Sequence, residues 1–507
     1  MAIAWGYSPK IEKYIPLGDF PADKYIIIAK QAAENLGWNI SHISDVGVIA
    51  YTPLSLQSYS EEISIKIEHN FAIVKSECIG IQLLFNDYGK NEINLDKFFH
   101  EFKYVEFHLE DVWQSTLENF HAFANQQDKD YFEKAPLTAK NKIKNVLYLL
   151  LPQKNYQITP ILILINIALY FLKIIASIVY FSYVFKHKLA INEIENLYYY
   201  LGGNSREVVL NGQYWRLLTY QFIHGSFSHL FFNMYALAYI GLMIEHKLGA
   251  KKYLTIYFLS GISGGVLSMF FHTEGYMVGA SGAIIGMFGA FLALLLGKAF
   301  EKNATKALLI STIAVTFIML LNGLKGGVDN AAHVGGLLAG FLITTILFHQ
   351  KPLNIKLQEK QRYLIAVLLA IFFAIPSLLL MPKYQIKEFN RLEIEYQLNA
   401  RKFTTIYWLK RGLSKEEKLS AIKNNGINVW KANDSIVKKM DLLKVDKRQQ
   451  NIISFHQKMV KRHLELVGLF YKRTTTDGQT YFYDTEIQSL QMDINNIRLN
   501  IKNPTRF

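Results

Sequence analysis

Cysteine is almost missing from this chain of 507 residues, since Cys78 is its single cysteine. One cysteine cannot form an internal disulfide, and it cannot build a cysteine-rich zinc site. No acidic pair, cysteine–histidine cluster or phosphate loop supports a cofactor, so we expect no metal and no nucleotide. The N-terminal stretch also lacks the basic-then-apolar layout of a cleavable signal peptide, so we expect that the N-terminal segment is not exported.

The sequence is instead rich in apolar residues, with 51% hydrophobic and 14% aromatic positions. This composition is too apolar for an ordinary soluble enzyme and indicates a membrane protein. Stretches of about 17–25 residues with almost no charge are long enough to cross a bilayer as helices. Seven stretches meet this condition: 161–185, 228–246, 253–272, 280–298, 306–322, 331–348 and 363–381.

The net charge of +14 has an uneven distribution along the chain. Basic residues precede the first apolar stretch and lie in the connections after the second, fourth and sixth stretches. In the connections 273–279 and 323–330 the only basic residue is Lys325. Basic connections stay in the cytoplasm, so we expect a cytoplasmic N-terminus and, after seven crossings of the cell membrane, an extracytoplasmic C-terminus. The basic charge is then explained by topology and by anionic lipid headgroups, and we expect no nucleic acid as a partner.

Residues 1–150 predict a small cytoplasmic α+β domain. The segment YIIIAKQAAENLGW has a helical pattern that is closed by Gly37, and ISIKI (63–67) alternates like a strand. His69 and Asn70 give a modest turn signal that leads from this strand into FAIVK.

Residues 383–507 predict a mostly helical extracytoplasmic domain. The expected signals are a capping box that starts at Ser414, a helix stop at Gly426 and a turn near Asp477 and Gly478.

Four polar residues inside the apolar stretches are functional candidates. His229 and Asn233 lie one turn apart in the second stretch, Ser281 lies in the fourth and His333 in the sixth. A polar side chain in a membrane costs free energy unless it faces protein or water. Under the charge-derived topology these three stretches start from the same side, so we expect the four residues at similar depth near the outer face.

The residue types indicate a serine nucleophile. Serine needs a base within hydrogen-bond reach, usually an imidazole, and Ser281 and His333 supply this pair. An oxyanion needs hydrogen-bond donors, which a backbone N–H at a helix start and the side chains of His229 and Asn233 supply. Each residue taken alone has a structural alternative. Ser281 is then a small packing residue and His333 a hydrogen-bonded structural histidine, while His229 and Asn233 bridge helices.

Glycines explain how the helices approach one another. Gly336 and Gly340 form a small-xxx-small face on the sixth stretch, and Gly282, Gly286 and Gly289 form a matching groove on the fourth.

The motifs resemble those of the rhomboid family of intramembrane serine proteases. The matching elements are a WR pair at Trp215 and Arg216, HGSFSHLFFN (224–233), GASG (279–282) and AHVGGLLAG (332–340). Their order on alternate helices is highly specific, and the resemblance covers roughly residues 157–350. It implies a six-helix core, to which the stretch 363–381 is a C-terminal addition.

The resemblance implies a Ser-His dyad with Ser281 as the nucleophile and His333 as the general base. It further implies an oxyanion hole made by His229, Asn233 and the backbone N–H of Ser281. Positions that we expect to support the fold rather than the chemistry are Trp215, Arg216, His224, Gly279, Gly282, Gly286, Gly336 and Gly340. Rhomboids often carry an aromatic residue four positions after the serine, where this chain has Ile285.

We therefore expect an α-helical multi-pass membrane protein with a six-helix rhomboid-like core, a seventh membrane helix and two flanking soluble domains. Its activity would be hydrolysis of peptide bonds in the transmembrane segments of other proteins, with those proteins and membrane lipids as partners. Partners of the soluble domains stay open. Two alternatives also stay open: a non-catalytic rhomboid-like protein that binds membrane clients, and a transporter that uses the polar cluster as an ion or substrate site.

Three further polar residues need an explanation. Glu245 is expected to pair with a cation or to cap a neighbouring helix. Asp329, four residues before His333, is an alternative third member of a triad. Lys173 interrupts the first apolar stretch, and the sequence assigns it no partner.

Overall fold

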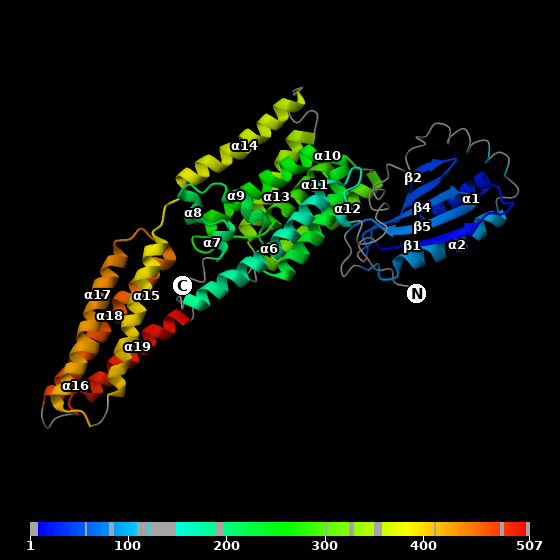
Figure 1. Cartoon of the computed structure of the whole chain (residues 1–507). Helices are drawn as coiled ribbons and strands as arrows, with labels where there is room; N and C mark the ends of the chain where they lie inside the picture. The colour runs from blue at the N-terminus through cyan, green and yellow to red at the C-terminus, as the bar shows by residue number, and fades with distance from the viewer. Residues whose placement is uncertain are drawn as a thin grey trace. The chain divides into compact units, whose positions relative to one another are not determined.

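The computed structural model has two compact units, Met1–Leu380 and Met381–Phe507, which are described separately (Figure 1). The described residues are 9–55, 58–80, 86–108, 113, 117, 120, 149–187, 197–300, 302–323, 329–348, 357–409, 412–476 and 481–502.

The N-terminal part is a five-stranded antiparallel sheet with two helices that contact each other (Figure 1). The strand order is β1-β5-β4-β3-β2. The elements are β1 Lys10–Pro16, α1 Ala22–Asn35, β2 Asn39–Ser44, β3 Gly47–Tyr51, β4 Glu61–Glu68, β5 Phe71–Cys78 and α2 Lys90–His108. Apolar side chains of both helices and of the sheet form one buried core.

The helix, strand and turn predicted in this part are confirmed. α1 is followed by Gly37, whose φ of 71° lies in the left-handed region that favours glycine. The segment 63–67 lies in β4, which pairs with β5 in antiparallel register. His69 and Asn70 between them have φ values of 47° and 63°, as a two-residue hairpin turn requires.

Each of the seven apolar stretches is mostly helical. The helices are α6 Ile158–His187, α10 Phe227–Phe271, α11 Ser281–Leu296, α12 Lys302–Gly323, α13 Asn330–Phe348 and α14 Glu359–Leu380. α10 contains two stretches, because Gly249 has non-helical angles and separates its two halves. Five of the described helices are long and apolar enough to cross a membrane, and α11 is a shorter apolar helix of 16 residues.

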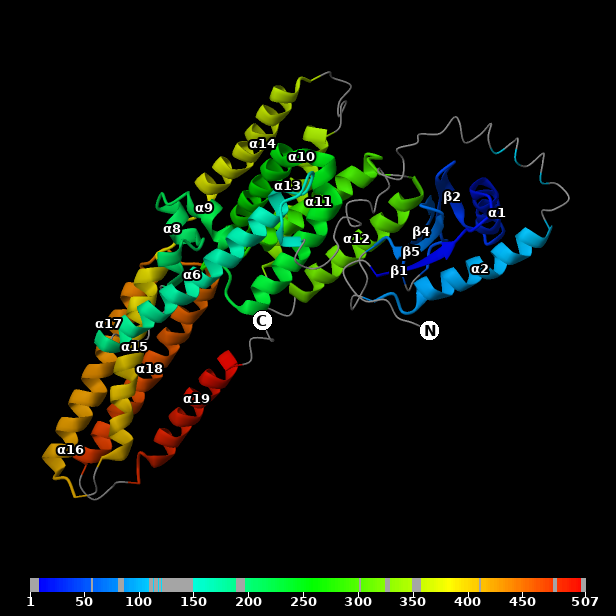
Figure 2. The ribbon, with the colours of Figure 1, turned by 45° about the vertical axis from the view of Figure 1, so that its right-hand side comes forward.

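α10, α11 and α13 pack against one another, and α6 packs on α10 (Figures 1 and 2). Glu245 of α10 caps the start of α6. Its carboxylate accepts hydrogen bonds from the backbone N–H groups of Gln157 at 2.6 Å, Ile158 at 2.7 Å and Thr159 at 3.0 Å. Of the two roles expected for Glu245, the helix cap is therefore confirmed, because these N–H groups have no partner within their own helix.

All regular secondary structure among the described residues of the second unit is helical. Its elements are α15 Ile386–Phe403, η6 Thr404–Trp408, α16 Lys415–Ile422, the π-helical turn η7 Lys423–Ile427, α17 Asn428–Asp441, α18 Lys447–Thr475 and α19 Asp484–Lys502. Their apolar faces enclose one core, in which the Trp430 ring stacks on the imidazole of His463 at 3.9 Å between centroids.

The capping box at the start of α16 is confirmed. The hydroxyl of Ser414 accepts from the backbone N–H of Glu417 at 3.1 Å, and the Glu417 carboxylate accepts from the backbone N–H of Ser414 at 2.8 Å. The helix stop at Gly426 is wrong, because the chain continues through η7 into α17. A Cβ at Gly426 would lie 2.6 Å from Val467, so this glycine permits close packing. The predicted turn at 477–478 lies outside the described residues.

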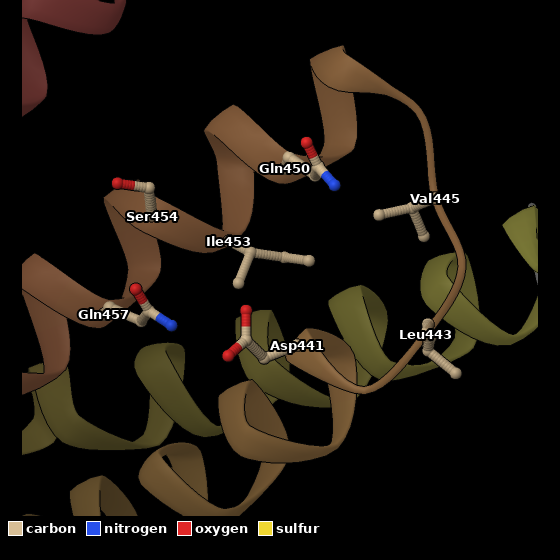
Figure 3. Close-up of a pocket in the computed structure, with 7 residues that line it drawn as sticks. All are labelled: Asp441, Leu443, Val445, Gln450, Ile453, Ser454 and Gln457. Carbon is tan, nitrogen blue, oxygen red and sulfur yellow. The ribbon is translucent and has the colours of Figure 1, made fainter.

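A cavity of about 180 Å³ lies at the turn between α17 and α18 (Figure 3). It is lined by Asp441, Leu443, Val445, Gln450, Ile453, Ser454 and Gln457. None of these residues belongs to the site that the sequence predicts.

Candidate active site

Ser281 is the first residue of α11 and is half-buried. The chain reaches it through Gly279, whose φ of 124° lies in the region that favours glycine. The backbone N–H of Gly279 donates to the carbonyl of Tyr220 at 2.9 Å. Ser281 therefore stands at a helix N-terminus, where backbone N–H groups have no partner within the helix and are available to an anion.

The segment that leads to Ser281 is held by the connection between α6 and α10. This connection contains α7 Leu197–Leu201, α8 Arg206–Leu210, α9 Arg216–Thr219 and η5 Tyr220–Phe222. Met277 forms an antiparallel bridge with Asn204, in which each backbone N–H donates to the other residue's carbonyl, at 2.6 and 3.0 Å. Neither this bridge nor the Tyr220 contact is visible in the sequence, because both use backbone groups that any residue carries.

His333 lies in the first turn of α13 and is only 5% exposed. Neither of its ring nitrogens has a hydrogen-bond partner among the described residues. Its helix lies directly against α11, because a Cβ on Gly336 would overlap the carbonyl oxygen of Gly282. Ser281 precedes Gly282, and His333 lies one turn before Gly336, so the two predicted dyad residues lie at the same end of two helices in contact.

The other glycines of the predicted contact face behave in the same way. A Cβ on Gly340 would overlap the carbonyl of Gly286, and one on Gly289 would overlap the carbonyl of Leu337. Gly286 also lies against the side chain of Ser260 of α10. Glycine is thus needed on α11 and α13 because the two backbones touch.

His229 lies beside the segment that carries Ser281. A Cβ on Gly279 would lie 2.7 Å from Cε1 and 2.8 Å from Nε2 of His229. The Asn233 side chain, one turn further along α10, donates instead to the backbone carbonyl of His229 at 2.8 Å. The described contacts include no hydrogen bond that joins the side chains of Ser281, His333, His229 and Asn233.

His224 and Lys173 support the start of α10. The His224 imidazole is fully buried, 5.1 Å from the ring of His229, and burial lowers the pKa of His224 to about 3, which keeps it uncharged. The ammonium of Lys173 in α6 donates to the carbonyl of Gly225 at 2.9 Å and lies 5.1 Å from the Tyr170 ring. Lys173 therefore has the partner that the sequence did not assign.

Trp215 and Arg216 lie in the connection between α6 and α10. The Arg216 guanidinium is buried and donates to the carbonyl of Gly203 at 2.9 Å and to the side chain of Gln213 at 2.6 Å. It also lies 4.6 Å from the ring centres of Trp215 and Tyr199. These contacts join segments of the connection and touch none of the four polar residues.

Asp329 caps α13. One carboxylate oxygen accepts from the backbone N–H of Ala332 at 2.9 Å, and the other accepts from the hydroxyl of Ser268 in α10. The described contacts include no hydrogen bond between Asp329 and the imidazole of His333, so the geometry gives no support to a triad acid. Ile285 is buried, and no aromatic ring packs on His333 in the part of the chain that the structure describes.

Comparison with known proteins links this arrangement to one family. A family model described as the Rhomboid domain matches residues 211–350. The chain is 34% identical over 210 residues to the Rhomboid protease AarA of Providencia stuartii, which covers 37% of this chain and 71% of that protein.

Two further relatives cover smaller shares. The chain is 37% identical over 145 residues to RHOMBOID-like protein 6, mitochondrial, of Arabidopsis thaliana, covering 29% of this chain and 47% of that protein. It is 32% identical over 165 residues to Rhomboid-like protease 1 of Toxoplasma gondii, covering 32% of this chain and 56% of that protein. The chain spans about half the length of these two curated relatives.

Proposed function

The chain belongs to the rhomboid family, and we propose that it is an intramembrane serine endopeptidase that cleaves the transmembrane segments of other membrane proteins. The observation that carries this proposal is the contact of α11 and α13 at Gly282 and Gly336. It brings the ends of the two helices that carry Ser281 and His333 together. A buried imidazole at the same end of the helix pair as a serine at a helix start suits acyl transfer.

In the proposed mechanism the Ser281 hydroxyl attacks the scissile carbonyl, and His333 takes its proton and returns it to the leaving amine. Water then hydrolyses the acyl-enzyme with His333 again as the base. The oxyanion is bound by the backbone N–H of Ser281 and the side chains of His229 and Asn233. For this the Asn233 amide must turn from the His229 carbonyl to which it now donates.

We further propose a core of six membrane helices, which are α6, the two halves of α10, α11, α12 and α13, with α14 as a seventh. The basic connections favour a cytoplasmic N-terminal domain (1–150), a core within 157–350 and an extracytoplasmic helical domain (383–507). Water and substrate would reach the dyad from the outer side, where a substrate helix must unwind because a helical backbone shields its carbonyls.

The test compares the parent with Ser281→Ala and with Ser377→Ala, a matched control in α14 that is not among the predicted site residues. Purified protein is incubated with a model transmembrane substrate and, separately, with a fluorophosphonate probe. We expect Ser281→Ala alone to lose both cleavage and labelling. Cleavage by Ser281→Ala at the parent rate would refute the mechanism.

The labelling assay and a separate flux assay address the alternatives. A non-catalytic rhomboid-like protein that binds membrane clients would show no Ser281-dependent labelling in the parent. A transporter would show substrate flux that survives the loss of Ser281. Comparison of membrane proteomes from cells with parent and Ser281→Ala protein then identifies the substrates.

A further inference from the structure

We propose that Asp329, Ser268 and His272 form a polar brace between α10 and α13 that positions the imidazole of His333. The inference rests on the proposed function, because it assigns positioning residues for the same reaction. The brace is named by these three residues, of which Ser268 and His272 lie at the end of α10 and Asp329 directly precedes α13.

The three side chains form a chain of hydrogen bonds. Nδ1 of His272 lies 3.1 Å from the Ser268 hydroxyl, and this hydroxyl donates to Oδ2 of Asp329. A serine hydroxyl has one proton, so its oxygen accepts from Nδ1–H of His272. The same nitrogen lies 3.8 Å from Oδ1 of Asp329. Ser268 is fully buried, whereas the His272 side chain is 48% exposed, so the brace runs from a solvent-facing imidazole to a buried contact.

The brace acts on Ala332, the residue that precedes His333. Oδ1 of Asp329 accepts from the backbone N–H of Ala332, and the Asp329 carbonyl accepts from the N–H of His333 at 3.1 Å. The Ala332 carbonyl would lie 2.6 Å from a Cβ on Gly264 of α10 and 3.5 Å from one on Gly282 of α11. Ala332, the residue before His333, is therefore held at its N–H by the brace and at its carbonyl by two neighbouring helices.

This geometry makes Asp329 a positioning residue and not a catalytic one. Both of its carboxylate oxygens accept hydrogen bonds, from Ser268 and from Ala332, and neither accepts one from the imidazole of His333 in the described contacts. Loss of the brace frees the first turn of α13 to shift relative to Ser281. Misplacement of a catalytic group by about 1 Å can cost about 100-fold in rate.

The test uses full-length protein in detergent with the variants Asp329→Ala, Asp329→Asn and Ser268→Ala. Glu359→Gln, at the start of α14, is the acid-to-amide control. We measure kcat and KM for a transmembrane substrate, the rate of fluorophosphonate labelling and amide hydrogen exchange over the first turn of α13. Size-exclusion chromatography selects folded protein.

Asp329→Ala is expected to lower kcat and the labelling rate about 100-fold, with KM within about threefold, because His333 moves and substrate binding does not change. Asp329→Asn is expected to recover most of this loss, since its amide oxygen still caps the Ala332 N–H. Ser268→Ala removes the link to α10 without touching the cap and should lower kcat about tenfold. Faster exchange at the start of α13 should accompany both losses.

The proposal is overturned if folded Asp329→Ala and Ser268→Ala react and exchange like the parent, or if Asp329→Asn is as slow as Asp329→Ala. If Asp329→Ala does not fold, Ser268→Ala decides the outcome. A parent protein without Ser281-dependent labelling would instead refute the proposed function, and the exchange measurement would still test the brace.

Discussion

Replacement of Gly336 by alanine is expected to slow the reaction strongly while leaving the protein folded. A Cβ at this position would lie 2.9 Å from the carbonyl carbon of Gly282 and would overlap its oxygen. Backbone atoms cannot rotate away as the end of a flexible side chain can, so α11 and α13 must separate by about 1 Å. Ser281 and His333 are carried by these two helices at the contact, and they must separate with them.

The expected loss follows from this displacement. A shift of about 1 Å in a catalytic pair lowers the rate about 100-fold, which corresponds to about 2.7 kcal/mol in activation free energy. The strain of an overpacked contact lowers the free energy of unfolding by about 1–3 kcal/mol. Gly336→Ala should therefore unfold at a lower temperature in detergent and react about 100-fold more slowly with both a transmembrane substrate and a fluorophosphonate.

Gly468→Ala is the matched control. Gly468 lies inside α18, and a Cβ there would have no heavy atom within 4 Å. Alanine stabilises an open helix position by up to about 1 kcal/mol relative to glycine, so this variant should be as active as the parent and at least as stable. If folded Gly336→Ala cleaves and labels at more than about half the parent rate, the close helix contact is not what positions the dyad.

Three further predictions concern single polar side chains. Lys173→Met should lower kcat about tenfold in the cleavage assay, because the Gly225 carbonyl loses its donor and the start of α10, which carries His229, is less firmly positioned. Lys173→Arg should retain more activity. Glu245→Ala should lower the free energy of unfolding in detergent by about 3 kcal/mol, since it leaves the first backbone N–H groups of α6 without an acceptor. Burial lowers the pKa of His463 to about 4, below the ordinary 6.5, so the unfolded chain binds more protons between these pH values. The second unit should therefore lose about 3 kcal/mol of stability as the pH falls from 6.5 to 4, measured by near-ultraviolet circular dichroism, and His463→Phe should remove this dependence.

Functional residues can be predicted from the sequence where their presence costs free energy unless they have a role. Ser281 and His333 stand out because a polar group in an apolar helix costs free energy. The helices around them are predicted from the length of the apolar stretches. The hairpin at His69 and Asn70 was predicted for a similar reason, since few residues adopt positive φ readily.

The residues that hold the site leave no such pattern. Asn204 and Tyr220 act through backbone groups, and their partners, at Met277 and Gly279, are distant in sequence. Gly426 was misassigned for the converse reason. A glycine after a helical pattern is typical of a helix end. Here the glycine is needed because Val467 of α18 packs against it, and this residue is distant in the sequence.

Ile285 stands where the rhomboid resemblance leads us to expect an aromatic residue, and the structure gives it a physical context. An aromatic residue at that position could pack on the imidazole of His333, whereas Ile285 is a buried part of the α11 core. The position of α13 must then determine how the imidazole of His333 is oriented. Because Asp329 and Ser268 hold the first turn of α13 to α10, the proposed brace supplies the support that an aromatic ring at position 285 would otherwise supply. Ser268→Ala should consequently lower the cleavage rate less in an Ile285→Phe protein than in the parent, because the new ring packs on His333. If Ser268→Ala lowers the rate equally in both proteins, an aromatic ring at position 285 does not replace the brace.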